Sequence, residues 1–217
     1  MILYANIINM TVGIAALMVI YQTIPILIRS QPPAGFGGDA SSIATVQLPY
    51  MVVSLIFSVA SGFLVSRFGN LRPTTVGTIV TTVGFFILFL YHFTETSIAT
   101  VLVIVAVGLA LMQIGSVNVV LTSTPKQFSG VSLGMNLLIY LIGSSVGPMI
   151  AGTLMQANQI TTISSNGILN SYPSPESYNL IFLTATIISL ASVIFAILLN
   201  RNKRSVGTDF KEQRILT

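Results

Sequence analysis

Long apolar stretches alternate with short polar breaks along this chain. Each stretch has about 18–27 residues, enough for a helix to cross a hydrocarbon core of about 30 Å. None contains a charged residue, and they cover residues 2–28, 44–65, 74–91, 98–121, 131–155 and 178–199. A transmembrane β-barrel would need strict alternation, which runs such as VLVIVAVGLALM lack. The pattern therefore predicts an all-α membrane protein whose residues 1–200 form a six-helix transmembrane bundle.

The composition excludes a water-soluble domain and most kinds of site chemistry. Only 6% of the residues are charged, whereas soluble domains carry about 25%. The chain has no cysteine and one histidine, His92, so a disulfide, a thiolate site or a histidine-rich metal cluster cannot form. The only basic cluster, at the C-terminus, has no interleaved aromatic residues, which argues against nucleic-acid binding. We expect neither a metal nor a cofactor.

The positive charges lie almost entirely on one side of the predicted helices. Eight of the nine lysine and arginine residues fall on that side, and only Arg29 falls on the other. Because cytoplasmic loops carry the excess of positive charge, we expect a multi-pass plasma-membrane protein with both termini in the cytoplasm. Residues 201–217 are then a basic cytoplasmic tail, and residues 156–177 are a long polar loop outside.

The turn between the second and third predicted helices carries a series of small and basic residues. Gly62 permits close approach of two backbones, and Gly69 suits the left-handed conformation that ends a helix. Arg67 lies near a helix C-terminus, where positive charge is favoured, and Arg72 precedes a proline suited to a helix start. By these arguments alone, the segment is a basic cytoplasmic turn.

A stripe of small residues marks the fifth predicted helix. Gly143, Gly147 and Ala151 are spaced four residues apart, so they share one face that lets two helices pack backbone to backbone. Pro148 cannot donate to the carbonyl of Ser144 and should bend the helix. The spacing alone fits a close-packed helix pair of no special function equally well.

Both segments resemble signature motifs of the major facilitator superfamily. The turn matches the family's loop between helices 2 and 3, although Ser66 and Asn70 stand where aspartate and a basic residue are common. The fifth helix resembles the family's antiporter motif, with Ala151 in place of one glycine; the matching residues are Gly134, Gly143, Gly147, Pro148 and Gly152. The resemblance implies one major-facilitator-type bundle, in which Gly62, Arg67, Gly69 and Arg72 form a cytoplasmic gating turn.

The resemblance also implies which half of a transporter this chain is. The first half of drug:proton antiporters in this family usually has an arginine within helix 4, whereas residues 98–121 are uncharged. The turn motif is degenerate, and the chain ends soon after its sixth helix. These features favour a C-terminal half, which requires as partner a second half of six or more helices, or a second copy.

Polar residues within the spans are candidates for a substrate pathway, because polar groups are costly inside a membrane. The candidates are Gln22, Gln113, Asn118, Asn136 and Tyr140. The first three lie on the two helices that line the central cavity in the family, and the last two lie one turn apart on one face. For each, the alternative is a hydrogen bond that only holds the bundle together. For Asn6 and Asn9 the alternative is a position at the membrane interface.

His92 and Glu95 lie at the outer end of the third predicted helix. Histidine titrates near neutrality, so proton coupling is one interpretation, and an exposed loop pair is the simpler one. An intramembrane protease would need a Ser–His, paired-Asp or metal site within the bilayer. Because His92 is at a span end and no aspartate lies in any span, we do not expect an enzyme.

The resemblance implies half of a secondary active transporter that works by alternating access. The antiporter motif implies proton-coupled export of small hydrophobic or cationic compounds, as in multidrug efflux. Since no carboxylate lies in any predicted span, the proton-coupling acid is expected in the other half. The alternative is a non-transporting membrane protein, either a remnant or an assembly partner of a separate transporter half.

Overall fold

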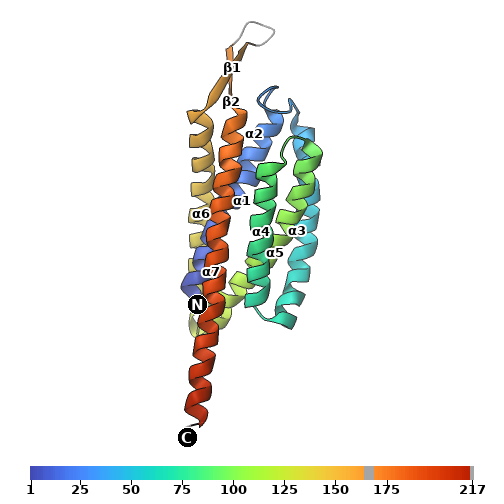
Figure 1. The fold of residues 1–217 in the computed structure, drawn as a ribbon. Helices are drawn as coiled ribbons and strands as arrows, with labels where there is room; N and C mark the ends of the chain where they lie inside the picture. The colour runs from blue at the N-terminus through green and yellow to red at the C-terminus, as the bar shows by residue number, and fades with distance from the viewer. Residues whose placement is uncertain (164–168, 216–217) are drawn as a thin grey trace.

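The computed structural model describes the backbone of residues 1–163 and 169–215, and the side chains of residues 1–161 and 171–201. The helical elements form one elongated bundle, and a β-hairpin projects from one end (Figure 1). The helical elements are α1 (Ile2–Ala16), η1 (Leu17–Thr23), α2 (Ile24–Arg29), α3 (Ala40–Phe68), α4 (Leu71–Leu90), α5 (Glu95–Ser123), η2 (Lys126–Phe128), α6 (Ser129–Ala157) and α7 (Pro175–Ile215). The strands are β1 (Gln159–Ile163) and β2 (Leu169–Pro173).

The described residues contain six helices that are long and apolar enough to cross a membrane. The first span runs through α1, η1 and α2, the fifth consists of η2 and α6, and the others are single helices. This confirms the prediction of six apolar helices. The start of α1 and the end of α7 lie at the end opposite the hairpin (Figure 1). We call these two ends of the bundle the termini end and the hairpin end.

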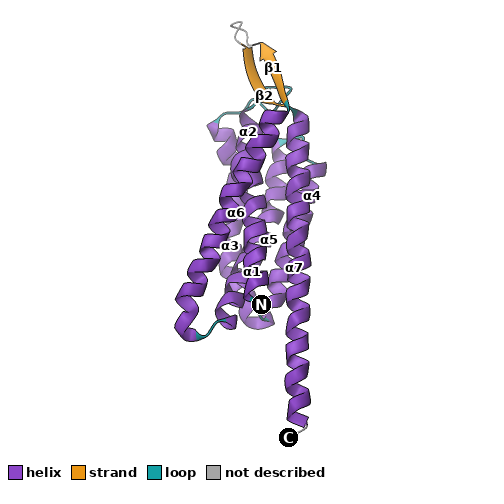
Figure 2. Cartoon of the chain, turned by 90° about the vertical axis from the view of Figure 1, so that its left-hand side faces the viewer, coloured by secondary structure: helices purple, strands orange, loops and turns teal. Residues whose placement is uncertain are grey.

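Two segments that the sequence suggested to be a loop and a tail have regular structure. Within the predicted polar loop at 156–177, β1 pairs antiparallel with β2, with Gln159 opposite Pro173 and Ile163 opposite Leu169. The β-branched residues of Gln159–Ile163 favour this extended pairing. From residue 201 onward, where a separate tail was predicted, α7 continues as a helix to Ile215 and extends beyond the bundle (Figure 2).

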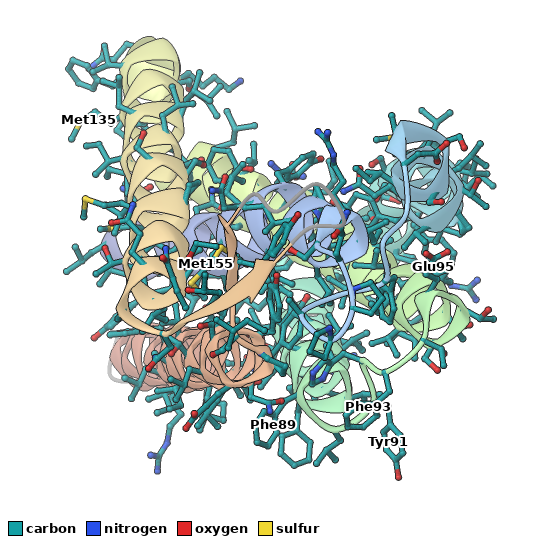
Figure 3. The ribbon with its side chains drawn as sticks, turned by 90° about the horizontal axis from the view of Figure 1, so that it is seen from above. Phe89, Tyr91, Phe93, Glu95, Met135 and Met155 are labelled. Carbon is teal, nitrogen blue, oxygen red and sulfur yellow. The ribbon has the colours of Figure 1, made fainter. Side chains whose placement is uncertain are left out.

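The spans differ strongly in how far the bundle covers them. In the most apolar window of each span, 61% of residues are buried in the first span, but only 17% are buried in α3 and 17% in the fifth span. Seen from the hairpin end, α6 and α3 stand at two corners of the bundle with the first span between them (Figure 3). On α6, Met135 points away from the other helices and Met155 points toward them (Figure 3).

The remaining helices form a tightly packed scaffold. At Gly77 of α4, an added Cβ would lie 2.5 Å from the backbone nitrogen of Met112 on α5, so only glycine allows this approach of the two helices. A hydrogen bond of 2.7 Å between the hydroxyls of Thr82 and Ser189 joins α4 to α7. Because α5 also carries part of the cavity described below, this packing fixes the position of one cavity wall.

The turn between α3 and α4 is held by its own residues. Gly69 has φ of +79°, the left-handed region in which other residues are strained. Asn70 donates from Nδ2 to the backbone oxygen of Asn118 at 3.2 Å and to the hydroxyl of Thr122 at 3.0 Å. These bonds tie the turn to the last turns of α5, so Asn70 has a structural role here.

His92, expected in an exposed loop, is instead packed into the hairpin end between α4 and α5. Its side chain is 7% exposed, and its Nδ1 lies 2.9 Å from the backbone oxygen of Leu88. The ring stacks on Phe93 and packs at an angle on Phe182 of α7, with ring centroids 4.9 Å apart in both cases. An imidazole donates this hydrogen bond in its neutral form, so the site does not require a charge.

Burial lowers the pKa of His92 below its ordinary value of 6.5, although its hydrogen bonds to Leu88 and Phe89 act in the opposite direction. The unfolded chain therefore binds this proton at higher pH than the folded chain, and stability is lost as the pH falls below about 6.5. We expect the free energy of unfolding in detergent to decrease below that pH, by at most about 1.4 kcal/mol per pH unit. A His92→Asn variant keeps a donor for Leu88 and should lose this component; equal pH dependence in both proteins would contradict the assignment.

Candidate functional site

A cavity of about 170 Å³ opens on the side of the bundle between α3 and α6. Its walls come from α1, η1, α3, α5 and α6. The polar groups that line it are Tyr21, Tyr50, Ser54, Ser58, Gln113 and Tyr140. Apolar residues of α1, η1 and α5 complete the lining. Four of the six spans therefore meet at this cavity, and two of them are the least covered helices of the bundle.

The lining suits an organic molecule without strong charge. No charged side chain is among the cavity residues. Phenol rings offer flat apolar faces that can also attract a cation, and Gln113 offers an amide donor and acceptor. Gln113 is exposed, whereas Tyr50 is only 8% exposed. The volume is below the roughly 300–1,000 Å³ of typical small-molecule sites, so this cavity has the size of part of a site.

Two of the residues proposed from the sequence line this cavity. Gln113 reaches it from α5 and Tyr140 from α6. The sequence interpretation missed Tyr21 on η1 and Tyr50 on α3. Tyrosine at mid-span in an otherwise apolar helix was the available signal, because its hydroxyl needs a polar partner or water.

Gln22 and Asn118 lie outside the cavity. Gln22 is half-buried on η1, next to Tyr21 but not part of the lining. Asn118 lies farther along α5 toward the termini end, where its Nδ2 donates to the backbone oxygen of Ile114 on its own helix at 2.8 Å. That bond is local, so it does not tie α5 to another helix.

Asn136 belongs to a buried network of amides between α1 and α6. Asn9 donates to its Oδ1 at 2.7 Å, and Asn136 donates to the Oδ1 of Asn6 at 2.6 Å. All three side chains are at most 7% exposed, so Asn6 and Asn9 lie inside the bundle and not on its surface. The Oδ1 of Asn9 has no hydrogen-bond partner among the described residues. The geometry is that of a link between helices, beside the cavity wall formed by α6.

The residues of the turn motif lie at the termini end. Arg67 and Arg72 are exposed, and the Arg67 guanidinium lies 5.7 Å from the ring centroid of Phe68. Gly62 was expected to permit a close backbone approach, but a Cβ there would meet no atom within 4 Å. Within the described part of the chain, its face of α3 is uncovered.

The motif glycines of α6 divide into two groups. Cβ atoms added at Gly143 and Gly147 would collide with the carbonyl oxygens of Met10 and Ile14 on α1. At Gly134 and Gly152, by contrast, an added Cβ would meet nothing within 4 Å. Pro148 lies inside α6, directly after Gly147. The stripe of small residues thus packs against α1 of the same bundle, while the two outer glycines face away from it.

Comparisons with known proteins found similarity to a solved structure and to a curated protein. The chain aligns with an inward-open structure of the xylose transporter XylE from E. coli with a TM-score of 0.69 and 11% identity, covering 91% of this chain and 47% of that chain. The tetracenomycin C resistance and export protein of Streptomyces glaucescens is 27% identical over 110 residues, which is 50% of this chain and 20% of that protein. This chain therefore spans less than half of the length of either protein.

The first of these likenesses establishes the fold as a six-helix bundle of the kind found in that transporter, as the sequence predicted. The family assignment rests on a separate match that covers almost the entire sequence. The family profile described as Major Facilitator Superfamily matches residues 3–215. This chain is a multi-pass membrane protein that belongs to the major facilitator superfamily of transporters.

Proposed function

We propose that this chain is one half of a secondary active transporter that works by alternating access. The observation that carries the proposal is the cavity of about 170 Å³ on the side where α3 and α6 are least covered. A second bundle placed against these two helices would close the cavity from the opposite side. The match to 47% of the XylE chain fits one bundle of two.

The substrate class follows from the cavity lining and from one relative. Three tyrosines and Gln113, without a charged side chain, favour small hydrophobic or cationic compounds with aromatic surface. The relative from Streptomyces glaucescens is named as an export protein, which supports export as the direction. We infer efflux coupled to protons. None of the described span residues that line the cavity is acidic, so the coupling acid would lie in the other half.

The orientation proposal rests on charge. Arg67, Arg72, Lys126 and Arg201 lie at the termini end, whereas Asp39, Glu95 and Glu176 lie at the hairpin end. By the positive-inside rule, the termini end faces the cytoplasm of a plasma-membrane protein and the hairpin faces outside. The α6 motif and the absence of charged residues from positions 98–121 of α5 further support a C-terminal half of the drug:proton antiporter branch.

A non-transporting role is the second candidate. The spans of the described residues carry no charged side chain away from their ends, and substrate and proton pathways usually need such groups. In that case the uncovered faces of α3 and α6 would serve only for assembly with a separate transporter half.

Reconstitution distinguishes the two candidates. We expect proteoliposomes with an imposed pH gradient to show proton movement driven by planar hydrophobic cations only when this chain is combined with its complementary half. Tyr140→Ala should raise the half-saturating substrate concentration roughly tenfold, because a buried aromatic contact contributes about 1–2 kcal/mol. Ile187→Ala, at an exposed position of α7, is the control. If no compound of the panel drives proton movement when the complementary half is present, the transport proposal is contradicted and the assembly role is favoured.

A further inference from the structure

The first span contains a wide helical turn next to the cavity. Over Leu17–Thr23, in η1, the backbone follows the π-helical pattern, in which each carbonyl bonds to the N–H five residues later. The N–H of Ile24 accordingly donates to the oxygen of Val19. The Thr23 hydroxyl adds a bond of 2.7 Å to the oxygen of Met18. Single π turns of this kind occur mostly within α-helices and often at functional sites.

Pro25 leaves one carbonyl of this turn without its backbone donor. In the i to i+5 pattern, the oxygen of Ile20 would accept from the N–H of residue 25, and proline has none. The N–H of Ile24, which would serve this oxygen in an α-helix, is already bonded to Val19. Ile20 is fully buried. In a membrane, such a carbonyl must find a donor inside the protein.

Gln47 of α3 supplies that donor. Its Nε2 donates to the oxygen of Ile20 at 2.8 Å, and its side chain is 8% exposed. We propose that the wide turn is a hinge with two hydrogen-bonding registers, and that Gln47 is the positioning residue that selects the π register. The role of the hinge in transport rests on the proposed function. The hinge itself is a property of this bundle and does not depend on transport.

The two registers place different residues at the cavity. In the π register, the Ile20 oxygen bonds to Gln47, and Tyr21 lines the cavity while Ile20 is buried. In the α register, the same oxygen bonds to the N–H of Ile24, and Gln47 is released. An α-helix rotates further about its axis per residue than a π turn. The transition from the π to the α register therefore rotates the part of the span toward the hairpin end by about one residue position. Ile20 then turns toward the cavity and Tyr21 turns away from it, which changes the polarity of the wall during a transport cycle.

The absence of native cysteine allows a direct test with single-cysteine variants in lipid nanodiscs. We expect a small water-soluble thiol reagent to label Tyr21→Cys much faster than Ile20→Cys. Adding Gln47→Leu should reduce this ratio of rates about fivefold to tenfold, the range that the loss of one net hydrogen bond supports. An unchanged ratio with Gln47→Leu would overturn the proposal.

A second background separates the hydrogen bond from simple packing. Pro25→Ala provides an N–H at residue 25 and removes the proline ring, so Gln47→Leu should then change the labelling ratio at least threefold less. An equal effect of Gln47→Leu in both backgrounds would show that Gln47 only fills space.

Thr82→Val removes a buried interhelical hydrogen bond elsewhere and should lower the melting temperature without changing the ratio of labelling rates. If Gln47→Leu does not fold, rescue of folding by Pro25→Ala tests the same pairing, and failure of that rescue would contradict it. The labelling result does not depend on flux, so a failed transport assay and a failed hinge are distinguishable.

Discussion

Replacing Gly147 by valine is expected to destabilise the bundle by about 3 kcal/mol, the upper part of the range for overpacked interiors. A Cβ at this position collides with the carbonyl oxygen of Ile14 and lies 3.1 Å from the backbone nitrogen of Met18. These are backbone atoms, so no rotamer change of a neighbour can relieve the contact, and α6 must move away from the first span. Circular dichroism during thermal or denaturant unfolding in detergent measures the effect.

The same helix offers matched controls. At Gly134 and Gly152, a Cβ would meet no atom within 4 Å. Valine at either position should change the stability of the isolated chain by less than about 1 kcal/mol, because only helix propensity is altered. Similar losses at Gly147 and Gly134 would show that the α1–α6 contact does not depend on the absence of a side chain.

The controls also bear on assembly with the proposed second half. If Gly134 and Gly152 lie against another bundle, valine at these positions weakens that association and leaves the isolated chain intact. The antiporter-like series in α6 would then serve two interfaces. Gly143 and Gly147 hold α6 to α1 inside the bundle, and the outer glycines contact the partner. The sequence interpretation assigned the whole series to one role, because the spacing of the glycines does not show which neighbouring helix each of them faces.

The number of spans was predictable from the sequence because the energetic cost of charge in lipid leaves long uncharged runs. Which face of each span meets a neighbour was not predictable, because these helices are apolar all round. Leu55 and Leu102 have the same side chain in similar contexts, yet they are 72% and 0% exposed. The cavity residues Gln113 and Tyr140 could be found because they are polar. Tyr50 gave the same signal, but only the packing shows that it lines the cavity.

The sequence interpretation missed features that depend on contacts between residues far apart along the chain. Pro25 indicates a break in the first span, but the register of the turn depends on Gln47, which lies on the next span. His92 resembled a loop residue because the pocket that buries it includes Phe182, ninety positions away along the chain. The β-hairpin, by contrast, could have been predicted. A connection of more than 20 residues without regular structure is uncommon, and the β-branched residues of Gln159–Ile163 favour a strand.

Substituting Asn136 by leucine should cost about 2 kcal/mol of stability, from two lost hydrogen bonds between helices in a membrane. The change removes the acceptor of Asn9 and the donor of Asn6. Because the Oδ1 of Asn9 already has no partner within the described side chains, the amide of Asn9 would then be left without any of its bonds. Both remaining groups are buried and cannot turn to water.

Asn118 provides the comparison for this substitution. Its side chain bonds only to the backbone of its own helix, so Asn118→Leu should cost less than about 0.5 kcal/mol. Replacing Asn6, Asn9 and Asn136 together by leucine should recover much of the loss, because a buried pair replaced on both sides leaves no group unsatisfied. Denaturant unfolding in detergent gives the free energy of unfolding of all three variants. Equal losses for Asn136→Leu and Asn118→Leu, or no recovery in the triple variant, would mean that Asn136 is not a structural link, and its place beside Tyr140 would then favour contact with substrate.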